Sequence, residues 1–143
     1  MSETKTIKGR GVTPGTATGE AIISEAAFMF AHGVEPANGD VIDIRSPLLG
    51  ENVKEKVLIF PFGKGSTTGS AWFLETIRQG NGPCAVINVE TEPIIATAII
   101  LGRLLYNTRI PLVDRLDTDI LAVARKGNTI TVNGDTGEVI IVS

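Results

Sequence analysis

Hydrophobic and polar positions along the chain follow one pattern up to about residue 54 and a different pattern after it. Up to that point glycine and proline recur every few residues, and the apolar positions form only brief runs. We therefore expect turns with short strands at residues 20–24 and 41–44. A turn-rich region of this length is unusual inside a compact domain. It is more typical of a segment with a function, or of one covered by a partner, than of a loop that only connects two elements.

Beyond residue 54 the apolar positions alternate between strand-like runs and helical spacing. Pro93 suits the first turn of a helix, and Asp117 or Thr118 suits a helix N-cap. The expected elements are strands at 57–60, 84–89 and 110–113, helices at 70–79, 93–106 and 119–125, and a hairpin over 128–142 that turns at 134–137. Alternating strands and helices imply parallel strands with right-handed crossovers. Because β-rich segments lie at both ends, we predict a layered α/β domain with a central parallel sheet, helices and an additional β layer.

Composition narrows the class of protein. With 143 residues, 43% of them hydrophobic and 20% charged, the chain is expected to form one domain over residues 1–143. A net charge of −3 without a basic run argues against a nucleic-acid-binding or membrane-surface protein. The longest apolar stretch, at 93–102, is about half the length of a membrane span, and no signal peptide is evident, so we expect a cytoplasmic protein.

The single cysteine and single histidine limit the chemistry further. Cys84 has no disulfide partner in the chain, and with His32 alone no His- or Cys-based metal site is expected. The pattern around His32 favours a structural or exposed histidine over a catalytic one, and Cys84 is typical of a small buried side chain. Arg10, in a Gly-Arg-Gly turn, is a weak candidate for holding an anion.

Residues 60–72, FPFGKGSTTGSAW, resemble a nucleotide-binding loop without matching one. A P-loop needs G-x-x-x-x-G-K-[ST], but this chain has Leu58 in place of the first glycine and Gly65 in place of the hydroxyl residue. The dinucleotide motif G-x-G-x-x-G starts at Gly63 but meets Thr68 where its third glycine belongs. The spacing therefore disfavours nucleotide binding.

What remains is a strand-to-helix turn at the carboxyl end of a strand, where α/β proteins bind ligands. Free amides at the start of the following helix would stabilise an anion or a serine alkoxide, so a proton-abstracting serine is chemically possible without a histidine, although free serine is a weak base. The simpler alternative is that residues 66–70 only cap a helix after a glycine turn. The next such turn contains two carboxylates, Glu90 and Glu92, near a helix start, and N-terminal capping is favoured there. The alternative places Glu90 or Thr91 at the rim of the same cleft.

Taken together, the segments GRGVTPGTATGEAIIS, SPLLGENVKEKVLIFPFGKGSTTGS, PCAVINVETEPIIATA and IPLVD resemble the swivel-domain, or small-subunit, family of the aconitase X group. The resemblance runs from Gly9 to about Asp114, and the C-terminal hairpin also fits. It implies a three-layer swivelling β/β/α domain with a central parallel sheet, as in the mobile domain of aconitases. It also implies a large aconitase X subunit as partner, in a heterodimer or higher assembly. That subunit would carry an iron or iron–sulfur centre, and this chain would bind no cofactor.

The resemblance also implies roles for the loop. Aconitase-like enzymes carry a proton-accepting serine directly after a Gly-x-Gly turn, and Ser66 occupies that position here. The implied substrate-binding residues are Gly63, Lys64, Gly65, Thr67 and Thr68. Aconitases follow the serine with a second serine and a substrate-binding arginine, whereas this chain has two threonines. The arginine is therefore expected from elsewhere, in the large subunit.

The implied function is that of a hydro-lyase small subunit acting on a small hydroxy acid. The favoured reaction is dehydration of (R)-5-phosphomevalonate to trans-anhydromevalonate 5-phosphate, a step of isoprenoid biosynthesis by a mevalonate pathway. An alternative within the class is dehydration of cis-3-hydroxy-L-proline. An alternative of another class is a non-catalytic anion-binding or assembly module.

Overall fold

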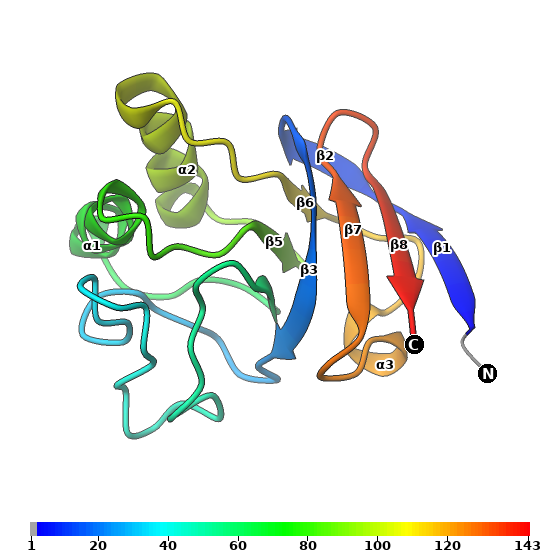
Figure 1. The fold of residues 1–143 in the computed structure, drawn as a ribbon, viewed down its shortest axis with the longest axis horizontal. Coiled ribbons are helices and arrows are strands. Elements are labelled where there is room, and N and C mark those ends of the chain that lie inside the picture. Colours follow the sequence, from blue (N-terminus) through cyan, green and yellow to red (C-terminus); the bar gives the residue numbers. More distant parts are fainter. Residues whose placement is uncertain (1–2) are drawn as a thin grey trace.

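The computed structural model describes residues 3–143 (Figure 1). Eight strands form one continuous sheet in the order β1-β8-β7-β3-β4-β5-β6-β2. The strands are β1 (Thr4–Lys8), β2 (Arg10–Thr13), β3 (Thr16–Ile23), β4 (Val57–Phe60), β5 (Ala85–Asn88), β6 (Leu112–Asp114), β7 (Thr129–Asn133) and β8 (Glu138–Val142). The helices are α1 (Thr67–Arg78), α2 (Pro93–Tyr106) and α3 (Ile120–Val123). Within residues 3–143 no helix has the length and apolar character needed to cross a membrane.

The central part of the sheet is parallel and buried on both faces. β3 pairs with β4, β4 with β5, and β5 with β6, all in parallel, and β2 closes the far edge antiparallel to β6. Every residue of β4, β5 and β6 is buried. Strands covered on both faces read as continuous apolar runs, which is why VLIF and AVIN show no polar alternation.

Strand β3 belongs to two layers. Its first half, residues 16–20, runs antiparallel to β7, and its second half, residues 21–23, runs parallel to β4. The sheet turns along this strand, so that β7, β8 and β1 form a separate layer. Figure 1 shows the result: α1 and α2 on one side, the parallel strands in the middle, and β7, β8 and β1 on the other. The predicted three-layer β/β/α architecture is confirmed.

Two hydrophobic cores fill the spaces between the layers. The core between the helices and the parallel sheet contains the four buried phenylalanines, Phe28, Phe30, Phe60 and Phe73. The core between the two sheets is almost entirely aliphatic and includes Ile59, Ile87, Val113, Ile130, Val132 and Ile141. Successive side chains of each parallel strand point alternately into one core and into the other, so the parallel sheet separates the two cores and contributes residues to both.

The segment between β3 and β4 is anchored by aromatic side chains rather than by strands. Phe30 stacks on Phe73 of α1 with ring centroids 3.8 Å apart, and Phe28 meets Phe30 edge-on at 5.4 Å. The strand expected at 41–44 is wrong: Val41 forms only an isolated bridge with Val34. The chain turns away directly afterwards, where the Asp43 carboxylate accepts the N–H of Arg45.

The N-terminal region also differs from expectation. The residues expected to be turns form β1 and β2, and β3 begins at Thr16 rather than at residue 20. Strands β1 and β2 are the two edges of the sheet, and they direct few apolar side chains inward: Ile7 is the buried residue of β1 and Thr13 that of β2. Backbone pairing with β8 and β6, rather than an apolar pattern, holds them in place.

Elsewhere the predicted elements need only local changes. Strand β4, helix α2 and the terminal hairpin are confirmed. Helix α1 begins three residues early because Ser66 caps it. Helix α3 is shorter than expected: its N-cap is Asp119, not Asp117 or Thr118, and it ends at Val123 because Ala124 has an extended backbone. Strand β6 starts at Leu112, after Pro111, which has no N–H to give to a sheet.

We predict that Phe30→Ala lowers the free energy of unfolding by about 3–5 kcal/mol, because it removes a ring that is 1% exposed and stacked on Phe73. Chemical denaturation of the purified chain measures this change. Leu104→Ala, at a side chain that is 73% exposed, is the matched control and should change stability by less than about 0.5 kcal/mol. Equal losses in both variants would contradict the assignment of Phe30 to the core.

Candidate functional site

The candidate site lies at the carboxyl edge of the parallel sheet. Three connections leave this edge side by side, after β4, β5 and β6, because these strands are parallel neighbours. The first leads to α1, the second to α2, and the third begins at Arg115. Main-chain hydrogen bonds join the first two: the Val89 and Glu90 N–H groups both donate to the Pro61 carbonyl, at 2.9 and 3.1 Å. The site is thus assembled from segments distant in the sequence.

Ser66 lies at the N-terminus of α1 and is exposed to solvent. It has extended backbone geometry, and its Oγ accepts the N–H of Thr68 at 3.3 Å, so Ser66 is the N-cap of α1. At this length the bond is weak, which leaves the hydroxyl available to a ligand. Thr67 and Thr68 in the first turn are also exposed, and that turn contains no acidic residue. The partial positive charge of the helix therefore faces solvent at Ser66.

The glycines before Ser66 determine the path of the loop. Gly63 is buried, and a Cβ there would overlap Oε1 of Glu92 and approach Ile95 Cγ1 to 2.8 Å. Gly65 has φ +115°, a backbone conformation that glycine adopts without strain. The N–H of Lys64 donates to the Phe28 carbonyl at 3.0 Å, so the segment after β3 holds the loop from its other side.

The predicted substrate-binding residues therefore differ in accessibility. Lys64, Gly65, Thr67 and Thr68 are exposed, whereas Gly63 is buried and shapes the loop from beneath. Among residues 3–143 the Lys64 ammonium makes no hydrogen bond or ion pair, so its charge is free to meet an anion beside Ser66.

Helix α2 presents a different N-terminus. The Glu92 carboxylate accepts the N–H groups of Ile94 and Ile95 at 2.6 and 3.0 Å, so the chain's own anion fills the position that a bound anion would take. The favoured capping of this turn by a carboxylate is confirmed for Glu92, whereas Glu90 pairs with Arg115. Ser70 of α1 donates to the Ile94 carbonyl at 2.8 Å and fixes the two helix starts against each other. Of these two helices, α1 is the one with an open anion position.

Two arginine–carboxylate pairs complete the edge, and the sequence did not reveal them. Arg10 donates from Nε and Nη2 to Asp114 at 2.8 and 2.7 Å, and the Thr91 N–H donates to the same carboxylate at 2.8 Å. Burial would raise the pKa of Asp114, but these hydrogen bonds outweigh it and hold the pKa below its ordinary value. Arg10 is thus a structural residue that ties β2 and β6 to the turn before α2.

The second pair joins Arg115 to Glu90. Arg115 Nη2 lies 2.7 Å from Glu90 Oε1, and its hydrogen bonds lower the pKa of that carboxyl. Arg115 has φ +50°, a left-handed conformation that costs an ordinary residue on the order of 1 kcal/mol.

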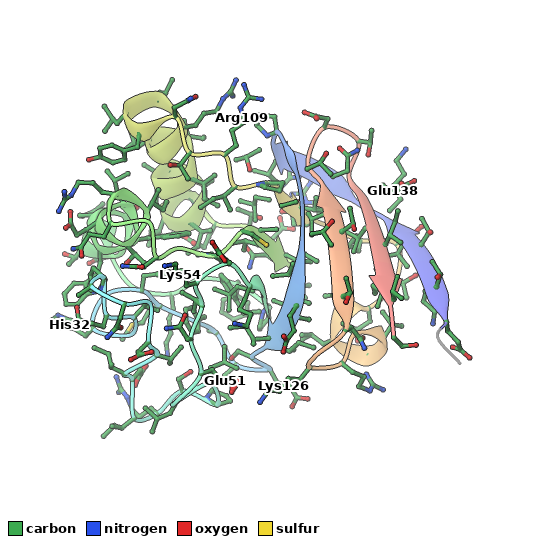
Figure 2. All side chains as sticks on the ribbon, viewed as in Figure 1. His32, Glu51, Lys54, Arg109, Lys126 and Glu138 are labelled. Atoms are coloured by element: carbon green, nitrogen blue, oxygen red, sulfur yellow. The ribbon has the colours of Figure 1, made fainter. Side chains whose placement is uncertain are left out.

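His32 and Cys84 take no part in this edge assembly. The His32 ring lies against Trp72, with centroids 4.6 Å apart, and Figure 2 shows it at the periphery of the molecule. Cys84 is half-buried, and desolvation raises the pKa of its thiol. In the described part of the chain, no three His, Cys, Asp or Glu side chains are placed together to hold a metal ion.

Comparison with known proteins places this fold and loop in a family. The family model described as the aconitase X swivel domain matches residues 6–141. The chain belongs to the aconitase X swivel-domain family. The phosphomevalonate dehydratase small subunit of Methanocella arvoryzae is 43% identical over 131 residues, which cover 92% of this chain and 95% of that protein. That of Thermococcus sibiricus is 42% identical over 134 residues, covering 93% and 95%.

The solved structures agree with the sequence relatives. A chain of Thermococcus kodakaraensis aconitase X in its holo-form is 36% identical to this swivel domain with a TM-score of 0.83, covering 96% of this chain and 98% of that one. The similarity therefore includes all three layers, and the resemblance seen in the sequence is confirmed at the level of family and fold.

We predict that Asp114→Asn lowers the free energy of unfolding by about 2 kcal/mol at pH 7, because it weakens the charge-assisted hydrogen bonds that the buried carboxylate accepts from the half-exposed Arg10 and from the Thr91 N–H. The folded-state pKa of Asp114 is lowered, so its carboxylate stabilises the fold above the unfolded-state pKa and this contribution is lost as the pH falls. The difference between wild type and variant should therefore shrink below about pH 4. Denaturant unfolding at several pH values measures it.

Glu75→Gln is the matched control for this pH series. Glu75 also forms a bidentate pair with an arginine, Arg78, but on the exposed surface of α1. Its removal should change stability little at any pH, because exposed ion pairs contribute little. A difference for Asp114→Asn that stays constant down to pH 2 would contradict the role given to its charge.

Proposed function

We propose that this swivel domain is the small subunit of an aconitase X-type hydro-lyase that dehydrates (R)-5-phosphomevalonate to trans-anhydromevalonate 5-phosphate. The observation that carries the proposal is the exposed Ser66 at the open N-terminus of α1, directly after the Gly63-Lys64-Gly65 turn. The names of the relatives support the substrate and the dependence on a large subunit.

In the proposed reaction Ser66 is the proton acceptor. Its Oγ, as the alkoxide, takes a proton from the carbon beside the substrate carboxylate. The electron pair of that C–H bond forms the new carbon–carbon double bond, and the C–O bond on the next carbon breaks as hydroxide leaves. A serine alkoxide is costly in water, but the free N–H groups and partial positive charge at the start of α1 stabilise it.

The same loop binds the anionic group next to the reacting carbon. The exposed backbone of Gly65 and the first-turn residues Thr67 and Thr68 offer N–H and hydroxyl donors, and Lys64 adds a positive charge with no partner within residues 3–143. An anion is favoured here and not at α2, where the Glu92 carboxylate already occupies the corresponding donors.

The proposal requires a partner, because this chain supplies only part of the chemistry. The loss of hydroxide needs a positive centre, and the described residues do not provide a metal-ligand set. We place an iron or iron–sulfur centre in the large subunit, where it would assist departure of the hydroxyl group when bound. The carboxyl edge with Ser66 would then face that subunit.

We predict that Ser66→Ala in the reconstituted two-subunit complex lowers kcat for dehydration by about a thousandfold, since it removes the proton acceptor. Ser70→Ala is the matched control: this hydroxyl is one helical turn away and donates to the Ile94 carbonyl, so its loss should change kcat by only a few-fold. If Ser66→Ala retained near wild-type dehydration, the catalytic role would fail and a non-catalytic anion-binding module would be favoured.

The second prediction concerns the purified chain without its partner. It should show no dehydratase activity and no stoichiometric iron by elemental analysis, and activity should appear only after the large subunit is added. Stoichiometric iron in the chain alone would contradict the proposal that the iron centre belongs to the large subunit. Assaying the complex with cis-3-hydroxy-L-proline alongside phosphomevalonate tests the substrate, and turnover of the proline derivative alone would overturn the substrate proposal while keeping the reaction class.

A further inference from the structure

A groove runs along helix α1, starting beside Ser66. Its volume is about 500 Å³, and it is lined by Thr68, Ala71, Trp72 and Glu75 of α1 together with Glu35 and Pro36. The four helix residues are spaced i, i+3, i+4 and i+7, so they share one face of α1. Thr68 belongs to the serine site as well, because its N–H donates to Ser66 Oγ. The groove is therefore a continuation of that site.

Trp72 gives the groove a fixed apolar surface. Its indole N–H donates to the Val34 carbonyl, its ring packs against the core beneath α1, and the His32 ring lies against it with centroids 4.6 Å apart. With the N–H already used, the indole offers the groove only apolar ring surface, to which Ala71 and Pro36 add. An aromatic side chain that is already held in place loses little entropy when a partner covers it, and tryptophan is enriched among residues that dominate binding energy.

The charged residues that line the groove are both glutamates, Glu35 and Glu75. Glu75 is neutralised by its bidentate pair with Arg78. Glu35 forms no ion pair within residues 3–143, and its carboxylate accepts only the Ala37 N–H, at a long 3.4 Å. An aromatic surface beside an unneutralised carboxylate is complementary to a cation on an apolar stem, which is the chemistry of an arginine or lysine side chain. The same charge disfavours an anionic substrate in this groove.

The position of the groove indicates which molecule covers it. It begins two residues from Ser66, and the proposed function requires the large subunit to approach that serine closely enough to complete the active site. The surface of the large subunit must then pass over Thr68 and the start of the groove. A second copy of this chain is a poorer match, because each copy has a net charge of −3 and two copies repel each other.

We propose that this groove is a docking site for the large subunit, which inserts an arginine or lysine whose stem covers Trp72 and whose charge pairs with Glu35. The inference rests on the proposed function, because that function is what brings the large subunit to α1. The groove contributes to assembly and not to the chemical step, since Trp72 and Glu35 do not touch the reacting atoms.

The test measures the Kd between this chain and the purified large subunit by titration calorimetry, with Glu35→Lys and Ala71→Tyr. Each substitution should raise the Kd at least about tenfold, because the first opposes like charges and the second fills the groove from an exposed helix position. The concentration of large subunit that gives half-maximal dehydration should rise in parallel. The kcat at saturation should stay within about twofold of wild type.

Two control variants make the same changes in the other layer. Glu138→Lys reverses an exposed charge on β8, on the opposite side of the molecule from His32 (Figure 2), and Thr6→Tyr adds the same ring at an exposed position of β1. Both should leave the Kd within about twofold of wild type, and all four isolated variants should keep the wild-type denaturation midpoint. An unchanged Kd in both groove variants, or equal losses in the controls, would overturn the proposal.

The wild-type chain provides a test that does not depend on any substitution. Trp72 is the single tryptophan, so a chain made with 5-fluorotryptophan has one ¹⁹F resonance. A soluble nitroxide should broaden this resonance in the isolated chain and should broaden it much less after the large subunit is added, because the docked segment excludes the nitroxide from the ring. A resonance that stays equally accessible in the saturated complex would contradict docking at Trp72.

The remaining outcomes separate this proposal from its rivals. Dimerisation of the isolated chain that Ala71→Tyr abolishes, with no change in the Kd for the large subunit, would assign the groove to a second copy and overturn the proposal. Normal binding by both groove variants would remove the docking site and leave the catalytic role of Ser66 standing. Near wild-type dehydration by Ser66→Ala would remove that catalytic role, while raised Kd values in the groove variants would still support docking.

Discussion

The parallel strands β4, β5 and β6 must be covered on both faces, and the rest of the molecule follows from that requirement. Burying continuous apolar strands needs one layer above and one below. Helices α1 and α2 provide the first, and the antiparallel strands β7, β8 and β1 provide the second. The parallel direction of the strands then brings their outgoing connections to one edge, which is where the functional candidates lie.

At that edge the N-termini of α1 and α2 differ in the charge of the residue that caps them. Glu92 closes the start of α2 with a carboxylate, whereas the start of α1 has only the hydroxyl of Ser66 and no acidic residue in its first turn. This contrast supports placing the reacting end of a substrate at α1. The Arg10–Asp114 pair, of which the carboxylate is buried, contributes indirectly, because it holds the Thr91 turn from which Glu92 reaches over Gly63.

The sequence predicted well those features that depend on neighbouring residues. The strand Val57–Phe60 follows from an uninterrupted apolar run, α2 from Pro93 and its apolar spacing, and the position of Ser66 from glycines and hydroxyls within one turn. Features that depend on distant pairing were missed. Arg10 and Asp114 are separated by 104 positions, and nothing local to either residue indicates the contact. Strands β1 and β2 were missed for the same reason, since pairing at sheet edges leaves little apolar pattern.

Strand β3 has a mechanical consequence. Because its two halves are hydrogen-bonded into different layers, neither layer can rotate against the other without breaking a ladder along β3. The loop that leads to Ser66 is joined to the segment that follows β3 by the bridge between Phe28 and Gly63. A motion that brought the Ser66 loop toward a partner would therefore have to carry all three layers together, with β3 as the strand that couples them.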